Sequence, residues 1–349
     1  MAIDKGALDT QLTRLWQDPA LRILEARDNK YAIISDLHLG NGARADDFRH
    51  NEKALLKALK RYEEEGYTLI LLGDVEEFWQ FDLDQVVARY DASVYAAIRA
   101  FGDERVIRLY GNHDYEWGGF VDPIRAGGRH TGQAAEALKL RDVEGNVSVF
   151  MVHGHQGSVD ADKFSWFSRF FVRIFAGIEP LTKHLGLFGH GSSTKSSVTK
   201  DYERIYYTWA KHNKVIVICG HSHRAIFASR SYYDRLSDKR AELLAENARG
   251  GLETGAHRRN QQTIDRLERS MADEKERGRM IEPVEATASV LPCYFNSGCG
   301  LYSDGITALE IEEDIIRLVK WDNQRFFGSA HHVFHEGKLS EFARVVQDR

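Results

Sequence analysis

Five short apolar runs that each end in polar residues constrain the fold of this chain most strongly. The runs cover residues 31–36, 68–74, 106–112, 147–153 and 214–221. Runs of this length and composition indicate buried strands that deliver polar side chains at their carboxyl ends. Helical patterns over residues 47–67 and 82–101 alternate with the first three runs. We therefore predict a layered α/β fold with a site where the strands end. The final stretch, residues 293–323, is expected to give two or three more strands that complete a second sheet.

The polar ends of these runs form five motifs with metal-ligand chemistry. In chain order they are Asp36-x-His38, Gly73-Asp74, Gly111-Asn112-His113-Asp114, His153-Gly154-His155 and Gly220-His221-Ser222-His223. Any one of them alone is common in turns and cores, but acids and imidazoles clustered at strand ends are costly to bury without a metal. Carboxylate, imidazole and amide ligands suit divalent Mn, Fe, Zn or Co. The sequence predicts a two-metal centre with the ligands Asp36, His38, Asp74, Asn112, His153, His221 and His223, in which Asp74 bridges the two ions.

Composition limits the other functional classes. A hydrophobic content of 43% and a charged content of 28% are those of an ordinary globular protein, and a net charge of −5 gives no general attraction to nucleic acid. Three cysteines without a paired spacing favour a reducing compartment. The first residues lack a secretory pattern, and no stretch is apolar enough to span a bilayer, so we expect a cytoplasmic protein.

Two segments interrupt what we otherwise expect to be a single domain over residues 1–349. Residues 160–197 form an aromatic helical insertion, a candidate lid, and residues 235–282 form a charged one that is a solvated helical hairpin around Gly250-Gly251 or partly disordered. Within 163–187, Arg169 and Arg173 lie one helical turn apart among aromatic residues. This pattern fits peripheral contact with an anionic membrane or the roof of an acyl site, with the arginines meeting a second phosphate. The alternatives are an aromatic face packed on the core and solvated arginines.

The five motifs resemble those of the calcineurin-like metallophosphoesterase superfamily across residues 32–321, the two insertions excepted. The resemblance implies a four-layer α/β/β/α sandwich. It implies that one metal is held by Asp36, His38, Asp74 and His223, and the other by Asp74, Asn112, His153 and His221. It also implies that His113 stands near the scissile phosphate and that Asp114 orients the His113 ring. Two cations about 3.5–4 Å apart can clamp a phosphate while a bridging water loses a proton and attacks. His113 then protonates the leaving oxygen or stabilises charge at phosphorus.

A narrower resemblance concerns the substrate. The pattern Gly73-Asp74-x-x-Glu77-Phe78-Trp79, the aromatic insertion after His153, and Gly220-His-Ser-His-Arg224 are similar to UDP-2,3-diacylglucosamine hydrolases, which cut a pyrophosphate bond in a lipid-bearing nucleotide sugar. Those enzymes commonly carry Arg at the position of His113 and Asp at that of His155. In this chain we expect His155 to orient His153 or to contact the substrate.

Three hypotheses follow. The first is Mn-dependent hydrolysis of a lipid- or nucleotide-linked pyrophosphate at the cytoplasmic membrane face. The second is a phosphodiesterase or phosphatase acting on soluble nucleotides, nucleic acid or phosphoprotein, with the charged insertion as a specificity cap. The third is a non-catalytic scaffold, against which the complete ligand set and His113 argue. No feature of the sequence indicates an oligomeric state.

Overall fold

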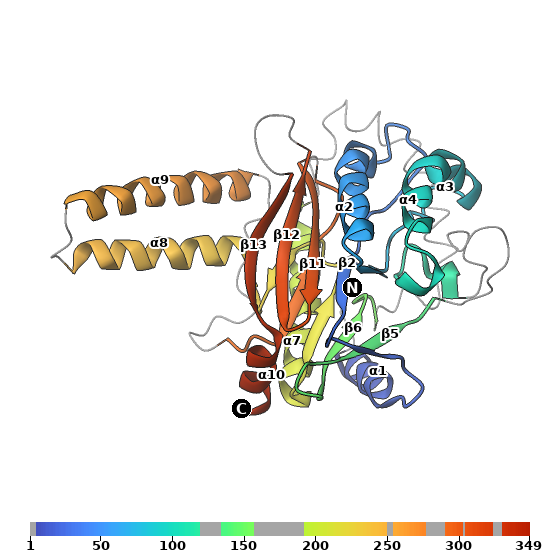
Figure 1. The fold of residues 1–349 in the computed structure, drawn as a ribbon, viewed down its shortest axis with the longest axis horizontal. Coiled ribbons are helices and arrows are strands. Elements are labelled where there is room, and N and C mark those ends of the chain that lie inside the picture. The colour runs from blue at the N-terminus through green and yellow to red at the C-terminus, as the bar shows by residue number, and fades with distance from the viewer. Residues whose placement is uncertain are drawn as a thin grey trace.

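Two β-sheets packed face to face form the centre of the protein (Figure 1). The computed structural model describes residues 5–118, 134–156, 192–249, 254–276, 290–302, 304–323 and 330–349. The first sheet has the strand order β13-β12-β11-β2-β3-β4. Its strands are β2 (Lys30–Ile34), β3 (Thr68–Leu72), β4 (Val106–Leu109), β11 (Gly305–Glu312), β12 (Ile315–Asp322) and β13 (His331–Lys338). Strands β2, β3 and β4 run parallel, so the polar residues that follow them leave the sheet at one edge.

The second sheet has the strand order β1-β5-β6-β7-β10-β8-β9. Its strands are β1 (Ile23–Glu25), β5 (Ala137–Arg141), β6 (Val147–Val152), β7 (Ile216–Cys219), β8 (Ala225–Phe227), β9 (Arg230–Ser231) and β10 (Tyr294–Ser297). Strands β6, β7 and β10 are parallel to one another. The residues that follow β6 and β7 therefore also emerge at one edge.

Helices cover the outer faces of both sheets. On the first sheet lie α2 (Glu52–Glu64), α3 (Leu83–Tyr90) and, after a π-helical turn (Asp91–Tyr95), α4 (Ala96–Arg99). Side chains of β2 alternate, with Ile34 packed beneath these helices and Ile33 between the two sheets. The second sheet is covered by α7 (Ser192–Asn213), on which α1 (Lys5–Gln17) packs. The last helix, α10 (Leu339–Gln347), contacts β7 and β13. The predicted four-layer α/β/β/α sandwich is confirmed.

Most predicted elements are present, and the last strands are arranged differently from the prediction. The five apolar runs are β2, β3, β4, β6 and β7, and the two helical patterns contain α2 and α3–α4. We expected the stretch after Cys293 to complete a second sheet. Instead β10 pairs with β7, whereas β11 pairs with β2 and extends the other sheet. The final strands therefore contribute to both sheets.

Helices α8 (Tyr232–Ala248) and α9 (Thr254–Glu276) lie side by side and project from the body (Figure 1). The two helices contact each other, Leu243 and Ile264 are buried, and Arg240 forms a 2.7 Å ion pair with Glu268. These helices fall in the charged segment 235–282, of which residues 250–253 and 277–282 lie outside the described part of the chain. Its status as an insertion stays a prediction. Among the helices described here, none combines the length and apolarity that a membrane crossing requires.

The aromatic segment 160–197 is described only from residue 192, where α7 begins. Arg169, Arg173 and the stretch 163–187 lie outside the described residues.

A buried ion pair beneath the loops that follow β3 and β4 offers a stability test. Arg108 on β4 contacts both carboxylate oxygens of Glu76, at 2.6 and 3.0 Å, and Glu76 also accepts hydrogen bonds from Tyr95 and Trp117. Removing one partner of such a pair leaves a buried charge, so we expect Arg108→Met to lower the free energy of unfolding by about 3–5 kcal/mol. Urea unfolding measures this. Arg99→Met is the control, because its pair with Asp91 is solvent-exposed and should contribute under about 1 kcal/mol. Equal losses in both variants would contradict the prediction.

Candidate metal centre

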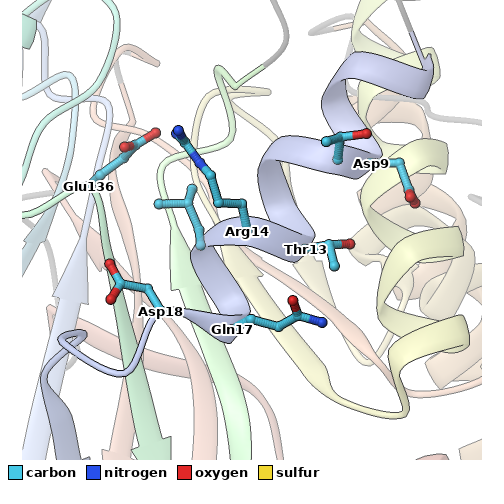
Figure 2. A pocket seen from close by; sticks show the side chains of 8 residues that line it. Asp9, Thr13, Arg14, Gln17, Asp18 and Glu136 are labelled. Carbon is cyan, nitrogen blue, oxygen red and sulfur yellow. The ribbon is translucent and has the colours of Figure 1, made fainter.

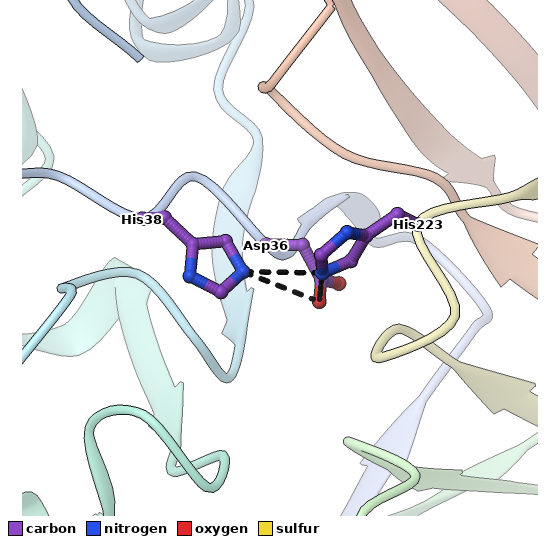
Figure 3. A group of neighbouring side chains, drawn as sticks. All are labelled: Asp36, His38 and His223. Atoms are coloured by element: carbon purple, nitrogen blue, oxygen red, sulfur yellow. Dashed lines mark hydrogen bonds and ion pairs between the residues drawn. The ribbon is translucent and has the colours of Figure 1, made fainter. Parts of the chain in front are cut away.

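Three side chains from opposite sheets converge to form a first cluster (Figure 3). Asp36 and His38 follow β2, and His223 follows β7. Nε2 of His38 lies 3.2 Å from Nε2 of His223, and Nε2 of His223 lies 3.3 Å from Oδ1 of Asp36. One carboxylate oxygen and two imidazole nitrogens thus face a common point, as ligands of one cation do.

A second cluster, of Asp74, His153 and His221, lies beside the first. Nε2 of His153 is 3.0 Å from Oδ2 of Asp74, and the same Oδ2 is 3.9 Å from Nε2 of His38 in the first cluster. Oδ1 of Asp74 accepts a 2.8 Å hydrogen bond from the backbone N–H of His113. A single oxygen of Asp74 therefore faces both clusters.

The backbone at these residues adopts a conformation that side chains rarely tolerate. Five of the seven predicted ligands have φ between 51° and 63°: Asp36, His38, Asp74, His221 and His223. A left-handed non-glycine residue costs about 1–3 kcal/mol, and such residues gather at functional sites. The fold thus accepts local strain to turn these side chains toward one point.

Hydrogen bonds hold the Asp36 carboxylate and the loop of His221 in place. The carboxylate of Asp36 accepts from the backbone N–H of His221 at 2.9–3.0 Å and from the hydroxyl of Ser35. The side-chain amide of Asn296 donates to the backbone oxygen of Gly220 at 2.6 Å, and Ser297 contacts Ser35 at 2.7 Å. Strand β10 thereby fixes the position of the loop that carries two predicted ligands.

Glu77 connects the first cluster to His113. Its Oε2 lies 2.8 Å from Nδ1 of His38, and its Oε1 lies 2.8 Å from Nδ1 of His113. Burial acts to raise the pKa of Glu77, but His113 and His38 lower it to about 2, so the carboxylate stays charged. Despite burial, Asp74 and Glu77 raise the pKa of His113. Both imidazoles are held at Nδ1, which leaves Nε2 of each ring available for other contacts.

The expectation that Asp114 orients the His113 ring is not met among the described residues. Its carboxylate instead accepts backbone hydrogen bonds from Val75 at 2.8 Å and from Gly111 at 2.6 Å. Burial and the nearby Asp74 and Glu76 raise the pKa of Asp114. Asp114 therefore ties together the loops that follow β3 and β4, and the contact with His113 is made by Glu77.

The carboxylates create a field that favours a cation. Burial acts to raise the pKa of Asp74 and Asp36, but His153 and other imidazoles lower the pKa of both. Conversely, the two aspartates raise the pKa of the buried His153 to about 10. Burial and His153 lower the pKa of His221 to about 3, so this ring is neutral and able to act as a ligand.

Buried polar atoms without partners provide a direct test of whether a metal fits. Among the described residues, Oδ1 of Asn112 and Nε2 of His153 are buried and make no hydrogen bond, although the latter lies close to Asp74. Such atoms are costly unless they bind something. An amide oxygen and an imidazole nitrogen are donors that a divalent cation takes, and the His153 nitrogen lies 3.0 Å from Oδ2 of Asp74. The described residues fit a metal.

Other candidate residues are placed less directly at the site. His155 is buried, and the centroid of its ring lies 5.5 Å from that of His153. Burial and the nearby His153 lower the pKa of His155. His155 therefore lies beside the second cluster, next to its member His153. A surface groove lined by Arg14, Asp18 and Glu136 lies along α1 and includes none of the predicted site residues (Figure 2).

Helix α7 also contacts the loop of residues 220–224 between β7 and β8, and the sequence did not predict this contact. The ring of Tyr202 meets His221 edge-on, with centroids 5.3 Å apart, and Glu203 forms a 2.7 Å ion pair with Arg224. The sequence motif that ends at Arg224 drew attention to Arg224, but it did not indicate Glu203 as the partner of that arginine.

Gly111 approaches Asp74 so closely that a methyl group would displace it. A Cβ at Gly111 would lie 2.1 Å from Oδ1 and 2.7 Å from the backbone nitrogen of Asp74. We expect Gly111→Ala to weaken metal binding by about 10-fold or more, in the range seen when contacts that orient ligands are lost. Competition with a chelating dye measures this affinity. Gly255→Ala on α9 is the control, because the same substitution there brings a Cβ no closer than 3.6 Å to another residue, the side-chain end of Arg259. Unchanged affinity in Gly111→Ala would contradict the prediction.

Histidine and aspartate side chains that converge from the strand ends of two sheets form a site that can hold metal ions. The sequence profile of calcineurin-like phosphoesterases matches residues 30–225, which include all seven predicted ligands. The chain belongs to the calcineurin-like phosphoesterase family. A search of the curated proteins gives no significant match.

Proposed function

We propose that this protein hydrolyses a pyrophosphate bond in a nucleotide- or lipid-linked substrate with the aid of two divalent cations. The observation that carries the two-cation proposal is the position of Asp74, whose Oδ2 faces His38 of one cluster and His153 of the other. One shared carboxylate between two sets of ligands is the arrangement that a dinuclear centre requires.

The ligands divide between the cations by cluster. Asp36, His38 and His223 would hold one, and Asp74, His153 and His221 would hold the other. Asp74 would also reach the first cation through Oδ2, and the buried Oδ1 of Asn112, which makes no hydrogen bond among the described residues, would complete the second set. When bound, the cations polarise the phosphate oxygens and activate the attacking water. Oxygen and nitrogen donors without cysteine suit Mn, and also Fe, Zn or Co.

His113 acts on the leaving group. Glu77 holds Nδ1 of the ring at 2.8 Å, so Nε2 is the nitrogen that can meet the substrate. As the bond between phosphorus and the leaving oxygen breaks, its electron pair goes to that oxygen. The proton on Nε2 of His113 moves to the same oxygen, and the attacking water supplies the oxygen that replaces it on phosphorus.

The lipid part of the proposal rests on the sequence pattern of residues 163–187 and on the similarity to UDP-diacylglucosamine hydrolases. Arg169 and Arg173 would meet a second phosphate, and His155 the substrate beside the second cation. The protein would then act in the cytoplasm, with peripheral contact at the inner face of the membrane.

A second candidate is hydrolysis of a phosphodiester or phosphomonoester in a soluble partner. The observation that favours it is the α8–α9 hairpin, which begins nine residues after His223 and carries exposed charges of both signs. A charged projection near the ligand loop would suit a polar macromolecule better than a lipid.

One experiment separates these candidates. The purified protein is loaded with Mn and given UDP-diacylglucosamine in detergent, a soluble nucleotide sugar, and a phosphopeptide. Release of UMP from the lipid substrate, at a kcat/KM well above that for the soluble ones, is expected. Efficient turnover of the soluble substrates alone would favour the second candidate. If neither these nor bis(4-nitrophenyl) phosphate is cleaved by protein with bound metal, the chain is a scaffold and the proposal fails.

A further inference from the structure

Trp79 stacks on the ring of His113 at the edge of the metal centre. We infer that Trp79 is a positioning residue that sets the tilt of the His113 ring for proton transfer to the leaving group. The inference rests on the proposed function, because it assigns Trp79 a part in the step for which His113 is proposed.

The contact between the two rings is close and well aligned. Their centroids lie 4.0 Å apart, and their planes differ by 23°. The indole N–H of Trp79 donates a 2.8 Å hydrogen bond to the backbone oxygen of Asn112. Trp79 is thereby tied to the same backbone segment that carries His113, so the indole and the imidazole keep a fixed relation.

Trp79 restrains a motion that Glu77 leaves free. The contact with Glu77 fixes the position of Nδ1, but a hydrogen bond at one ring atom allows the imidazole to tilt about that point. A flat indole against the face of the ring blocks this tilt, and the ring of His38 meets His113 at 81° with centroids 4.7 Å apart. With Nδ1 held and the face covered, the direction of Nε2 is set.

The direction of Nε2 matters only for leaving groups that need a proton. 4-Nitrophenolate leaves as a stable anion, whereas phenolate is more basic and benefits from protonation as the phosphorus–oxygen bond breaks. A defect in the aim of His113 should therefore slow a phenyl ester more than a 4-nitrophenyl ester. A general loss of structure or of metal would slow both to a similar extent.

The test uses two esters of thymidine 5′-phosphate that differ only in the leaving group, 4-nitrophenol or phenol. The proteins are the full-length wild type, Trp79→Leu, His113→Ala and the double variant, each checked for bound Mn. We expect Trp79→Leu to lower kcat for the phenyl ester by about 10-fold or more, a fraction of the 10²–10⁴-fold that a general acid contributes, and kcat for the nitrophenyl ester by about 2-fold. In the His113→Ala background, Trp79→Leu should change neither rate further.

Two further variants keep the test interpretable. Trp16→Leu is the matched control, because Trp16 packs against Phe150 and Trp209 away from the site and should slow both esters equally, if at all. Trp79→Phe retains an aromatic face but loses the N–H to Asn112, so it should give a smaller selective loss and serves if Trp79→Leu does not fold.

The outcomes distinguish the inference from the proposed function. Equal losses on both esters in Trp79→Leu, or the same selective loss in the His113→Ala background, would overturn the inference alone. If Mn-loaded wild type cleaves neither ester and none of the substrates tested for the proposed function, the proposed function fails, and the inference fails with it.

Discussion

Asp74→Asn is expected to lose hydrolysis by about 10³-fold or more and to bind fewer cations than the wild type. Oδ2 of Asp74 faces both clusters, so the substitution removes negative charge from both cation sites at once. Asparagine has the same shape as aspartate. Its side-chain oxygen can still accept the hydrogen bond that the backbone N–H of His113 donates to Oδ1 of Asp74. A bound cation stabilises the transition state by several kcal/mol, so the loss of one cation lowers the rate by about 10³-fold or more.

The measurements are the metal content of the purified protein and kcat on bis(4-nitrophenyl) phosphate. Asp142→Asn is the matched control, because Asp142 is also a buried aspartate that accepts backbone hydrogen bonds, from Glu144 and Asn146, but it lies in the β5–β6 turn. Its activity should equal that of the wild type. An Asp74→Asn protein with two bound cations and normal turnover would remove Asp74 from the proposed centre.

The buried strands were predictable because burial on both faces leaves a continuous apolar run. In β2, Ile33 packs between the sheets and Ile34 beneath the helices, so both positions are apolar. Strand β13 at the sheet edge carries His331, His332 and His335, and none of its eight residues is buried. Neither an apolar run nor a clean alternation marks it, and its pairing with β12 depends on the tertiary fold.

The pairing of the last strands could not be read from the chain for a similar reason. An apolar strand carries no label for its neighbour, and β10 and β11 are separated by only seven residues, 298–304. Register and sheet choice follow from which edge is open when the layers pack. The sequence therefore predicted these strands and not their partners.

At the site, residue types predicted which aspartates and histidines come together, but contacts between loops decide the supporting roles. Asp114 is adjacent to His113 in sequence, yet its carboxylate turns back to the amide of Gly111 and across to Val75. Glu77 reaches His113 because the loop after β3 pairs with the loop after β4, through a 3.2 Å bond from the Phe78 N–H to the His113 oxygen. That approach is a property of the folded chain.

Glu77→Gln is expected to lower kcat by about 10²-fold while the protein keeps its fold. The carboxylate accepts from Nδ1 of both His38 and His113, and a glutamine offers one acceptor and one donor in its place. If the amide NH₂ faces His38, Nδ1 must accept, so the proton moves to Nε2 and that nitrogen cannot bind a cation. If the NH₂ faces His113, the charged ring that donates a proton to the leaving group is disfavoured. Either orientation therefore impairs cation binding by His38 or proton donation by His113. Loss of a contact that orients a metal ligand typically costs 10–100-fold and loss of a general acid 10²–10⁴-fold, so we expect a loss in kcat of about 10²-fold.

The two orientations are separable by measurement. A weaker affinity for Mn in Glu77→Gln indicates damage at His38, whereas normal affinity with a selective loss on the phenyl ester indicates damage at His113. Glu310→Gln provides the control, since Glu310 is a buried carboxylate that likewise meets a histidine, His331 at 2.9 Å, as well as the hydroxyl of Tyr62, but in the core under α2. Its stability should fall while its kcat stays close to that of the wild type. Full activity and full Mn affinity in Glu77→Gln would show that neither imidazole depends on this carboxylate.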